Sequence, residues 1–410
     1  MSQRAGPGQG FDGQLASWFE QTAPTREPDD LLGRVLGQTV AIRPRPAWWP
    51  AGSPLDVLDR PRVVARRTLT LAAALALIAT LVGVALLAGS QPRLPLPLGR
   101  NGLLVAGRQG ELLLLDPTGK TVARTATGEH PGLGAWSHDG TRLAYADGTQ
   151  QAPQLVITDP DLRQVLRLPL PASTVPRFSW SPDDRHLTFG TDDGTAARVD
   201  VIDLAAGAVA RPITDVAVDG ILPVWSPDGG LIALRAGVSL DQQALYVVRP
   251  DGTGLTRLSR GARAVDVCSI AWTPDGRSIV FGTAAGEFAI WIVDRDGSHE
   301  RMLTSGSVQT FCPSVSPDGT RIAASVWQDT GRRMTVQALA GSPTVVTPAG
   351  PLWGDWPGVW APDGGTIAMN GRVLDGGPSP RAFLDPDAVA PATTFFADDA
   401  QIVDWQRLAP

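Results

Sequence analysis

The sequence predicts an all-β protein, a seven-bladed β-propeller, preceded by one transmembrane helix and a short α-helical N-terminal segment. Three observations lead to this prediction: a motif that recurs along residues 101–410, an uncharged apolar stretch at residues 68–89, and two amphipathic patterns before residue 40. The high contents of glycine (45 residues) and proline (36 residues) agree with many tight turns and few long helices.

The recurring motif has the form Trp-Ser-Pro-Asp-Gly followed by a short apolar run. Ser-Pro-Asp-Gly is typical of a type I turn, so the aromatic residue ends one strand and the apolar run forms the next. A third apolar strand and a fourth, more polar strand follow in each unit. Four short antiparallel strands per unit are typical of a propeller blade, and the six copies lie 43–47 residues apart. The copies begin at Trp136, Trp180, Trp225, Trp272, Val315 and Trp360.

A seventh blade can be assembled from both ends of the repeat region. Residues 103–105, 111–116 and 121–124 supply three strands, and residues 401–405 supply the innermost one, with Trp405 at the motif tryptophan's place. This closure leaves no inner strand unpaired. Six or eight blades would require one of these segments to lie outside the ring.

Residues 68–89 carry no charge and are 22 residues long. As a helix they span about 33 Å, enough to cross a hydrocarbon core of about 30 Å. A cleaved signal peptide is the alternative, but 67 preceding residues are too many for it. Four arginines lie at residues 60–67 and two at residues 90–100, so residues 1–67 are expected in the cytoplasm and the propeller outside. The proline-rich residues 90–100 are expected to form a stiff stalk.

Charge and cysteine content narrow the choice of partners and compartment. The net charge is −6, and the acidic excess falls in the propeller region, which argues against nucleic acid as its partner. The two cysteines, Cys268 and Cys312, each precede a motif copy and are therefore expected on adjacent blades. A single disulfide outside the cytoplasm and two buried thiols both fit.

The motif and its Ile-Ala-Phe-like strand resemble the TolB-type propeller repeat over nearly all of residues 101–410. The Gly-His and Trp-Asp signatures of WD repeats are absent from the sequence. The resemblance implies the fold. It leaves the function open among a partner-binding module, a substrate filter on a peptidase and a sensor domain.

Sequence motifs for catalysis and metal binding are missing. A serine peptidase would need a Gly-x-Ser-x-Gly elbow with a later Asp and His, and the sequence contains no such elbow. The four histidines are scattered, and His-Glu-x-x-His, Cys-x-x-Cys and EF-hand patterns are absent. Paired aspartates at 192–193 and 398–399 fit either calcium or solvated turns. We therefore expect a non-enzyme with no cofactor and no metal site.

Candidate binding residues on the propeller lie in the loops opposite the motif turns. Functional side chains are commonly carried by loops on a rigid scaffold, and these loops vary while the repeat does not. The candidates are Asp219, Asp266, Phe311, Trp327, Arg332, Trp353, Asp355 and Trp356.

Residues 1–67 contain two predicted helices, each with one apolar stripe that needs a partner. The inner membrane surface and a protein are the alternatives. The run at residues 21–36, followed by a membrane helix, resembles the N-termini of membrane-bound anti-sigma-like regulators, and this implies a cytoplasmic sigma factor as partner. The histidine and Cys-x-x-Cys of the zinc-binding anti-sigma class are missing, so neither that metal nor that fold is implied. The candidate contact residues are Leu15, Trp18, Phe19, Leu32, Val35 and Leu36.

The expected function is that of a non-enzymatic, single-pass membrane protein whose extracytoplasmic propeller binds a protein or a small ligand. The N-terminal segment would make it a transmembrane regulator of anti-sigma type. An extracytoplasmic scaffold for envelope assembly and a propeller-based hydrolase are the alternatives.

Overall fold

The computed structural model describes residues 98–410 apart from short gaps, and every regular element in that part is a β-strand. No helix long and apolar enough to span a membrane occurs among these residues. The expected transmembrane segment 68–89, the helices of residues 1–67 and the stalk up to residue 97 lie outside the described residues. The gaps are residues 173, 193–196, 206–208, 215–221, 238–242, 261–264, 284–287, 305–308, 329–330, 340–344, 347–351, 354–357, 373–379, 388–395 and 398–399.

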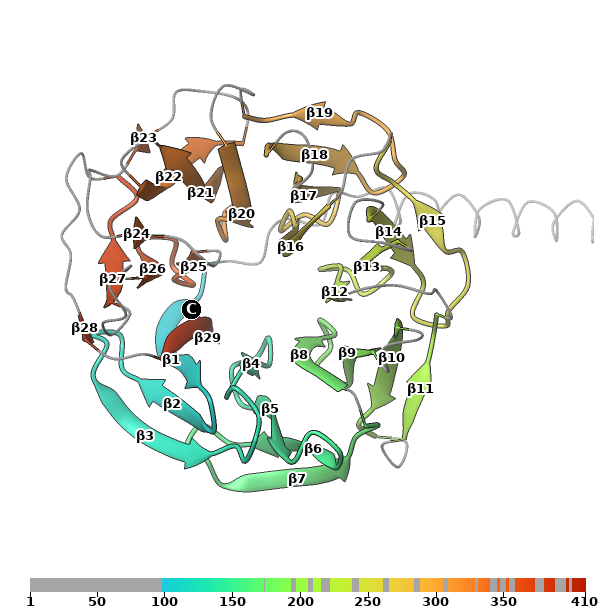
Figure 1. Cartoon of the computed structure of the whole chain (residues 1–410), viewed down its shortest axis with the longest axis vertical. Coiled ribbons are helices and arrows are strands. Elements are labelled where there is room, and N and C mark those ends of the chain that lie inside the picture. The colour runs from blue at the N-terminus through green and yellow to red at the C-terminus, as the bar shows by residue number, and fades with distance from the viewer. Residues whose placement is uncertain are drawn as a thin grey trace, which may run out of the picture. The chain divides into compact units, whose positions relative to one another are not determined.

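The strands form seven sheets, called blades A to G, arranged in a ring (Figure 1). Blade A contains β29 (Gln401–Leu408), β1 (Arg100–Arg108), β2 (Glu111–Leu115) and β3 (Thr121–Ala126). Blade B contains β4 (Gly134–Trp136), β5 (Leu143–Gly148), β6 (Pro153–Thr158) and β7 (Gln164–Pro169). Blade C contains β8 (Thr174–Trp180), β9 (His186–Asp192), β10 (Ala197–Asp203) and β11 (Ala210–Pro212). Blade D contains β12 (Val224–Trp225), β13 (Ile232–Ala236), β14 (Ala244–Val248) and β15 (Thr256–Arg257).

The remaining three blades follow the same order from the inner to the outer strand. Blade E contains β16 (Val265–Trp272), β17 (Ser278–Thr283), β18 (Ile290–Asp294) and β19 (Arg301–Met302). Blade F contains β20 (Gln309–Val315), β21 (Arg321–Gln328), β22 (Gly331–Ala338) and β23 (Val345–Val346). Blade G contains β24 (Leu352–Trp353), β25 (Val359–Trp360), β26 (Ile367–Arg372), β27 (Pro380–Leu384) and β28 (Phe396–Ala397), and both β24 and β25 pair with β26.

The ring closes in blade A, where the last strand of the chain pairs with the first. β29 lies antiparallel to β1, with Trp405 opposite Leu104. The pairing begins at Arg100, opposite Leu408, so the first strand starts three residues before the predicted strand 103–105. The predicted seven blades and their closure by both ends of the repeat region are confirmed.

The motif turn has the predicted geometry. In blade B the backbone N–H of Gly140 donates to the Ser137 carbonyl at 2.9 Å, and the Ser137 hydroxyl donates to Asp139 at 2.6 Å. Gly140 has φ +70°, the left-handed region that glycine adopts without steric cost. In blade C the same place is taken by Asp184, at φ +56°, and aspartate is one of the few other residues that tolerate this conformation.

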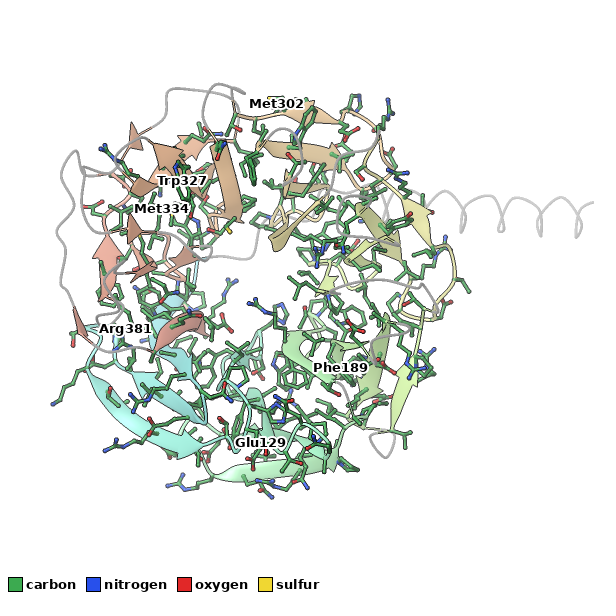
Figure 2. The ribbon with its side chains drawn as sticks, in the orientation of Figure 1. Glu129, Phe189, Met302, Trp327, Met334 and Arg381 are labelled. Carbon is green, nitrogen blue, oxygen red and sulfur yellow. The ribbon has the colours of Figure 1, made fainter. Side chains whose placement is uncertain are left out.

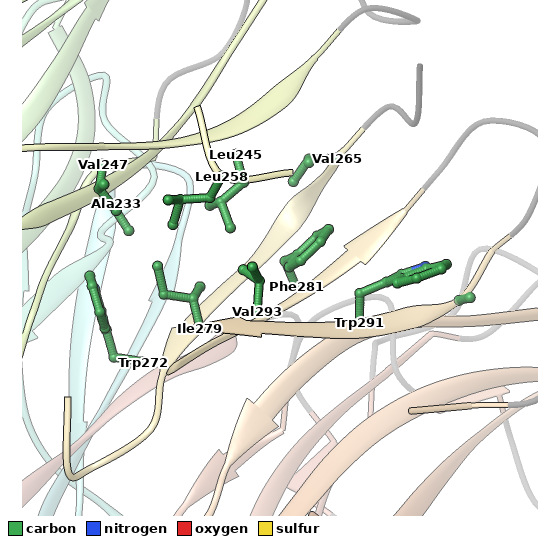
Figure 3. Close-up of a cluster of buried hydrophobic side chains, with 11 residues drawn as sticks. Ala233, Leu245, Val247, Leu258, Val265, Trp272, Ile279, Phe281, Trp291 and Val293 are labelled. Atoms are coloured by element: carbon green, nitrogen blue, oxygen red, sulfur yellow. The ribbon is translucent and has the colours of Figure 1, made fainter. Parts of the chain in front are cut away.

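Clusters of buried apolar side chains lie between neighbouring blades. In the cluster of Figure 3, Leu245 and Val247 of blade D pack against Trp272, Ile279 and Phe281 of blade E. Because each sheet is covered on both faces, its middle strands are buried almost throughout, whereas the outer strands β3 and β7 alternate exposed and half-buried positions. The motif tryptophans belong to these clusters, as predicted: Trp136, Trp180, Trp225, Trp272, Trp360 and Trp405.

Cys312 lies in β20 and is disulfide-bonded. The only other cysteine of the chain is Cys268, in β16 of the neighbouring blade. Of the two alternatives that the sequence left open, the disulfide is therefore the one present.

Candidate functional site: the central channel

The inner strands of the seven blades surround a central channel that contains two adjoining cavities. One has a volume of about 500 Å³ and is lined by β4, β8, β12 and β29. The other has about 400 Å³ and is lined by β16, β20, β25 and β29. Four residues line both cavities and mark where they meet: Arg177, Ile270, Val403 and Asp404.

Asp404 is the carboxylate at this meeting point. It directly precedes Trp405, a place that small or apolar residues fill in the other blades: Ala135, Ser179, Val224, Ala271, Ser314 and Val359. Its Oδ2 accepts the backbone N–H of Trp136 at 2.7 Å, and its Oδ1 accepts that of Trp405 at 2.8 Å. Burial raises the pKa of Asp404 to about 6, although these hydrogen bonds act to lower it. The channel therefore gains one negative charge as the pH rises through about 6.

Arginines supply the opposite charge. Burial lowers the pKa of Arg177, three residues before Trp180 in β8, to about 10, so its side chain is still charged at neutral pH. Burial also lowers the pKa of Arg407, which follows Trp405 in β29 and lines the larger cavity. An anionic group entering the channel would meet these two half-buried guanidinium groups, which attract it more strongly than fully solvated charges would.

His138 and Asp184, which replace the proline and the glycine of the motif turn, contact each other across the interface of blades B and C. Asp184 Oδ1 accepts the backbone N–H of His138 at 2.7 Å, and its Oδ2 accepts that of Asp139 at 3.0 Å. The His138 ring nitrogen Nδ1 lies 3.3 Å from Asp184 Oδ1. The carboxylate at the glycine position thus caps the neighbouring turn and fixes His138 at the wall of the larger cavity.

Replacement of Asp404 by asparagine is expected to change how stability depends on pH. Because the pKa of Asp404 is raised in the folded protein, protonation stabilises the fold below about pH 4, and this stabilisation is lost as the pH rises through about 6. The melting temperature of Asp404→Asn relative to wild type should therefore increase between about pH 4 and 7 and level off above. Thermal unfolding followed by circular dichroism across this range measures the difference.

Asp183→Asn provides the control with the opposite sign. Burial acts to raise the pKa of Asp183, but hydrogen bonds from Ser181 and the Arg185 backbone outweigh it and lower that pKa. Its stabilising effect is present above the ordinary value of 3.8 and is lost only in stronger acid. If the melting temperatures of Asp404→Asn and wild type changed in parallel across this pH range, the raised pKa of Asp404 would be contradicted.

The described residues show where part of the predicted propeller face lies. Trp327 is the penultimate residue of β21 in blade F and is 50% exposed (Figure 2). Arg332 is its backbone partner on β22, and Phe311 lies on β20 of the same blade. Asp266 lies on β16 and Trp353 on β24, which places these candidates on blades E, F and G.

The other predicted binding residues lie outside the described residues. These are Asp219, Asp355 and Trp356 on the propeller, and all six candidates of the N-terminal segment: Leu15, Trp18, Phe19, Leu32, Val35 and Leu36. Their roles stay predictions. Within the described part of the chain, no group of three or more His, Cys, Asp or Glu side chains is arranged to hold a metal ion.

The charged channel residues Arg177, Asp404 and Arg407 were missed by the sequence interpretation. The predicted binding residues were assigned to loops, whereas these three side chains come from the inner strands. A position-by-position alignment of the seven motif copies contains the signal. Directly before the aromatic residue only Asp404 is charged, and three residues before it only Arg177 is charged.

Six four-stranded sheets and one five-stranded sheet around a channel, with the last strand closing the first blade, define the class: a seven-bladed β-propeller protein. The chain belongs to the TolB beta propeller domain family, whose model matches residues 163–369.

Curated proteins resemble part of the chain in sequence. The chain is 30% identical over 152 residues to an uncharacterized peptidase of Bacillus subtilis, YuxL, covering 36% of this chain and 20% of that protein. It spans 20% and 59% of the lengths of the curated relatives it matches.

Two solved structures resemble the propeller. One is a functionally unknown protein from Desulfotomaculum acetoxidans, with a TM-score of 0.55 at 14% identity, covering 75% of this chain and 99% of that one. The other is an oligogalacturonate lyase in complex with manganese, with a TM-score of 0.54 at 18% identity, covering 68% and 84%. At these identities the likeness concerns the fold alone.

Proposed function

We propose that this chain is a non-catalytic, membrane-anchored regulator whose propeller lies outside the cytoplasm. The propeller binds a protein or small ligand that presents an anionic group to the channel, and residues 1–67 hold a cytoplasmic protein of the sigma-factor type. The observation that carries the propeller's part is the charged channel. Arg177 and Arg407 are positioned to attract an anion, and Asp404 sets the net charge.

Asp404 has a structural role at the channel wall. Both of its carboxylate oxygens accept backbone N–H groups, from Trp136 and Trp405. These hydrogen bonds join blades A and B, so the carboxylate connects two blades and also contributes charge to the channel.

Two features support the extracytoplasmic placement of the propeller. Cys312 is disulfide-bonded, and disulfides persist in oxidising compartments outside the cytoplasm. The arginines at residues 60–67 outnumber those at residues 90–100, which orients residues 68–89 with the N-terminus inside.

The cytoplasmic interaction is tested by affinity capture of the full-length protein from membranes. We expect a sigma-family protein to be recovered with wild type. The double substitution Leu32→Asp and Leu36→Asp should abolish its recovery, because two charges disrupt the apolar stripe of the second predicted helix. Arg43→Gln, outside that stripe, should leave the capture unchanged. Equal recovery with all three proteins, or recovery of no sigma-family protein, would contradict this part of the proposal.

A propeller-based hydrolase is the second candidate, because the Bacillus subtilis relative is named a peptidase. Incubation of the purified protein with peptide substrates separates the two functions. Hydrolysis that disappears in Asp404→Asn would favour the hydrolase. If substrates stay intact while an anionic ligand is bound by wild type and not by Arg177→Met, the binding function is favoured.

A further inference from the structure

Arginine side chains cover the motif tryptophan of the next blade at two blade interfaces. Between blades B and C, the guanidinium carbon of Arg142 lies 4.9 Å from the ring centre of Trp180. Between blades F and G, that of Arg321 lies 5.2 Å from the ring centre of Trp360. Both arginines are six residues after the motif aromatic position of their own blade. The fold therefore contains a repeated site for a guanidinium group.

Each of these arginines also reaches the motif turn of the next blade. Arg142 Nη2 donates to the carbonyl oxygen of Asp184 at 2.7 Å, and Arg321 Nη2 donates to that of Gly364 at 3.2 Å. Asp184 and Gly364 are the left-handed residues of their turns, with φ values of +56° and +75°. The guanidinium site thus has two parts, an aromatic ring and a turn carbonyl.

A histidine takes the arginine's position between blades C and D. The ring centre of His186 lies 6.0 Å from that of Trp225. Its nitrogens are directed toward its own blade, with Nδ1 3.8 Å from Asp183 and Nε2 3.9 Å from Asp203. Beside His186 lies a cleft of about 460 Å³, which Gly229, the left-handed residue of the blade D turn, also lines. At this interface the imidazole takes the place over the tryptophan ring, and the cleft leaves the space beside the turn residue Gly229 unfilled.

The walls of this cleft are acidic. Asp183, Asp228 and Asp251 line it together with one cation, Arg211, which donates to the Pro250 carbonyl at 3.0 Å, and Asp228 is paired with Arg295 at 2.6 Å. Burial acts to raise the pKa of Asp228, but hydrogen bonds from Arg295 and Ser226 outweigh it and lower that pKa to about 2. Hydrogen bonds from Thr253 lower the pKa of Asp251. The cleft is therefore negatively charged at neutral pH.

We propose that the cleft between blades C and D binds an arginine side chain of a partner protein. The guanidinium stacks beside His186 and Trp225 and donates to the Gly229 carbonyl and to the carboxylates of Asp183 and Asp251. The Arg142 and Arg321 sites supply the geometric precedent within the same molecule, and the excess of carboxylates supplies the complementary charge. Trp225 also lines the larger cavity of the central channel, but the proposal for this cleft stands independently of the function proposed for the channel.

The test uses the full-length protein and three small probes: the N-acetyl amides of arginine, citrulline and lysine. Citrulline has nearly the shape of arginine without its charge, and lysine has the charge without the planar group. Thermal unfolding at increasing probe concentration reports binding, since a ligand of the folded state raises the melting temperature. We expect the largest rise with the arginine probe, a smaller one with lysine and none with citrulline.

Two substitutions locate the site. His186→Arg should fill the cleft from within, raise the melting temperature by about 1–2 °C and remove the response to the arginine probe. His186→Gln leaves the cleft open and should keep the response. A His186→Arg protein that responds to the arginine probe as wild type does would overturn the proposal, as would an equal response of wild type to citrulline.

Discussion

Truncation after Ala400, which removes β29, is expected to abolish cooperative folding of the propeller. β29 is the inner strand of blade A and contributes Trp405 to the cluster between blades G and A. The buried Asn370 side chain both donates to the Ile402 carbonyl and accepts the Ile402 N–H, each at 2.7 Å. Domains of this kind are stable by only about 5–15 kcal/mol, so the loss of a whole inner strand exceeds what the fold can tolerate.

The measurement is urea unfolding followed by circular dichroism, together with limited proteolysis. Removal of Ala409 and Pro410 alone is the matched control. Both residues are exposed, and the Arg100 side chain donates to the Ala409 carbonyl at 2.9 Å. A protein truncated after Ala400 that kept a sharp unfolding transition and protease resistance would show that the ring does not depend on closure.

Trp180→Ala is expected to have the largest effect of any single substitution discussed here, a loss of about 3–5 kcal/mol in the free energy of unfolding. Trp180 is 2% exposed and packs with Leu155 and Phe189 between blades B and C. Its indole N–H donates to the Ala135 carbonyl of the preceding inner strand at 2.9 Å, and Arg142 covers its ring. Alanine leaves a cavity and removes both interactions.

Trp327→Ala is the matched control, because it deletes the same side chain from a site that is 50% exposed. Its effect on stability should stay within about 0.5 kcal/mol. Equilibrium unfolding in urea gives both values under the same conditions. Similar losses for the two variants would refute the assignment of Trp180 to the core. Loss of ligand binding without loss of stability in Trp327→Ala would support its role on the propeller face.

The fold could be predicted because six copies of one motif each indicate the same four-stranded blade. Most motif turns have serine, aspartate and a left-handed residue at fixed places, and six of the seven blades have a tryptophan at the aromatic position. Trp405, near the end of the chain, fits the same pattern, and it therefore predicts that the last strand closes the ring. A repeat of this kind is recognised even where single copies differ from the motif.

The candidate site in the channel was harder to predict because it consists of residues that differ from the repeat. The hydrogen bonds of Asp184 to His138 and Asp139 join two blades, and a turn pattern does not specify what the neighbouring turn presents. Arg177 and Asp404 occupy inward-facing strand positions whose role depends on a channel formed by all seven blades. The same limitation applies to His186, whose importance is visible only beside Arg142 and Arg321.

The meeting of both ends of the ring in blade A has a practical consequence for rearranging the chain. Because Arg100 pairs directly with Leu408, a short peptide could link the two ends, and new termini could be opened in the exposed hairpin between β14 and β15 at Asp251. In such a circular permutant the four strands of blade A would follow one another along the chain, and the new N- and C-termini would lie in blade D. Because Arg100 and Leu408 are paired, a reporter fused after Pro410 would lie next to the start of β1.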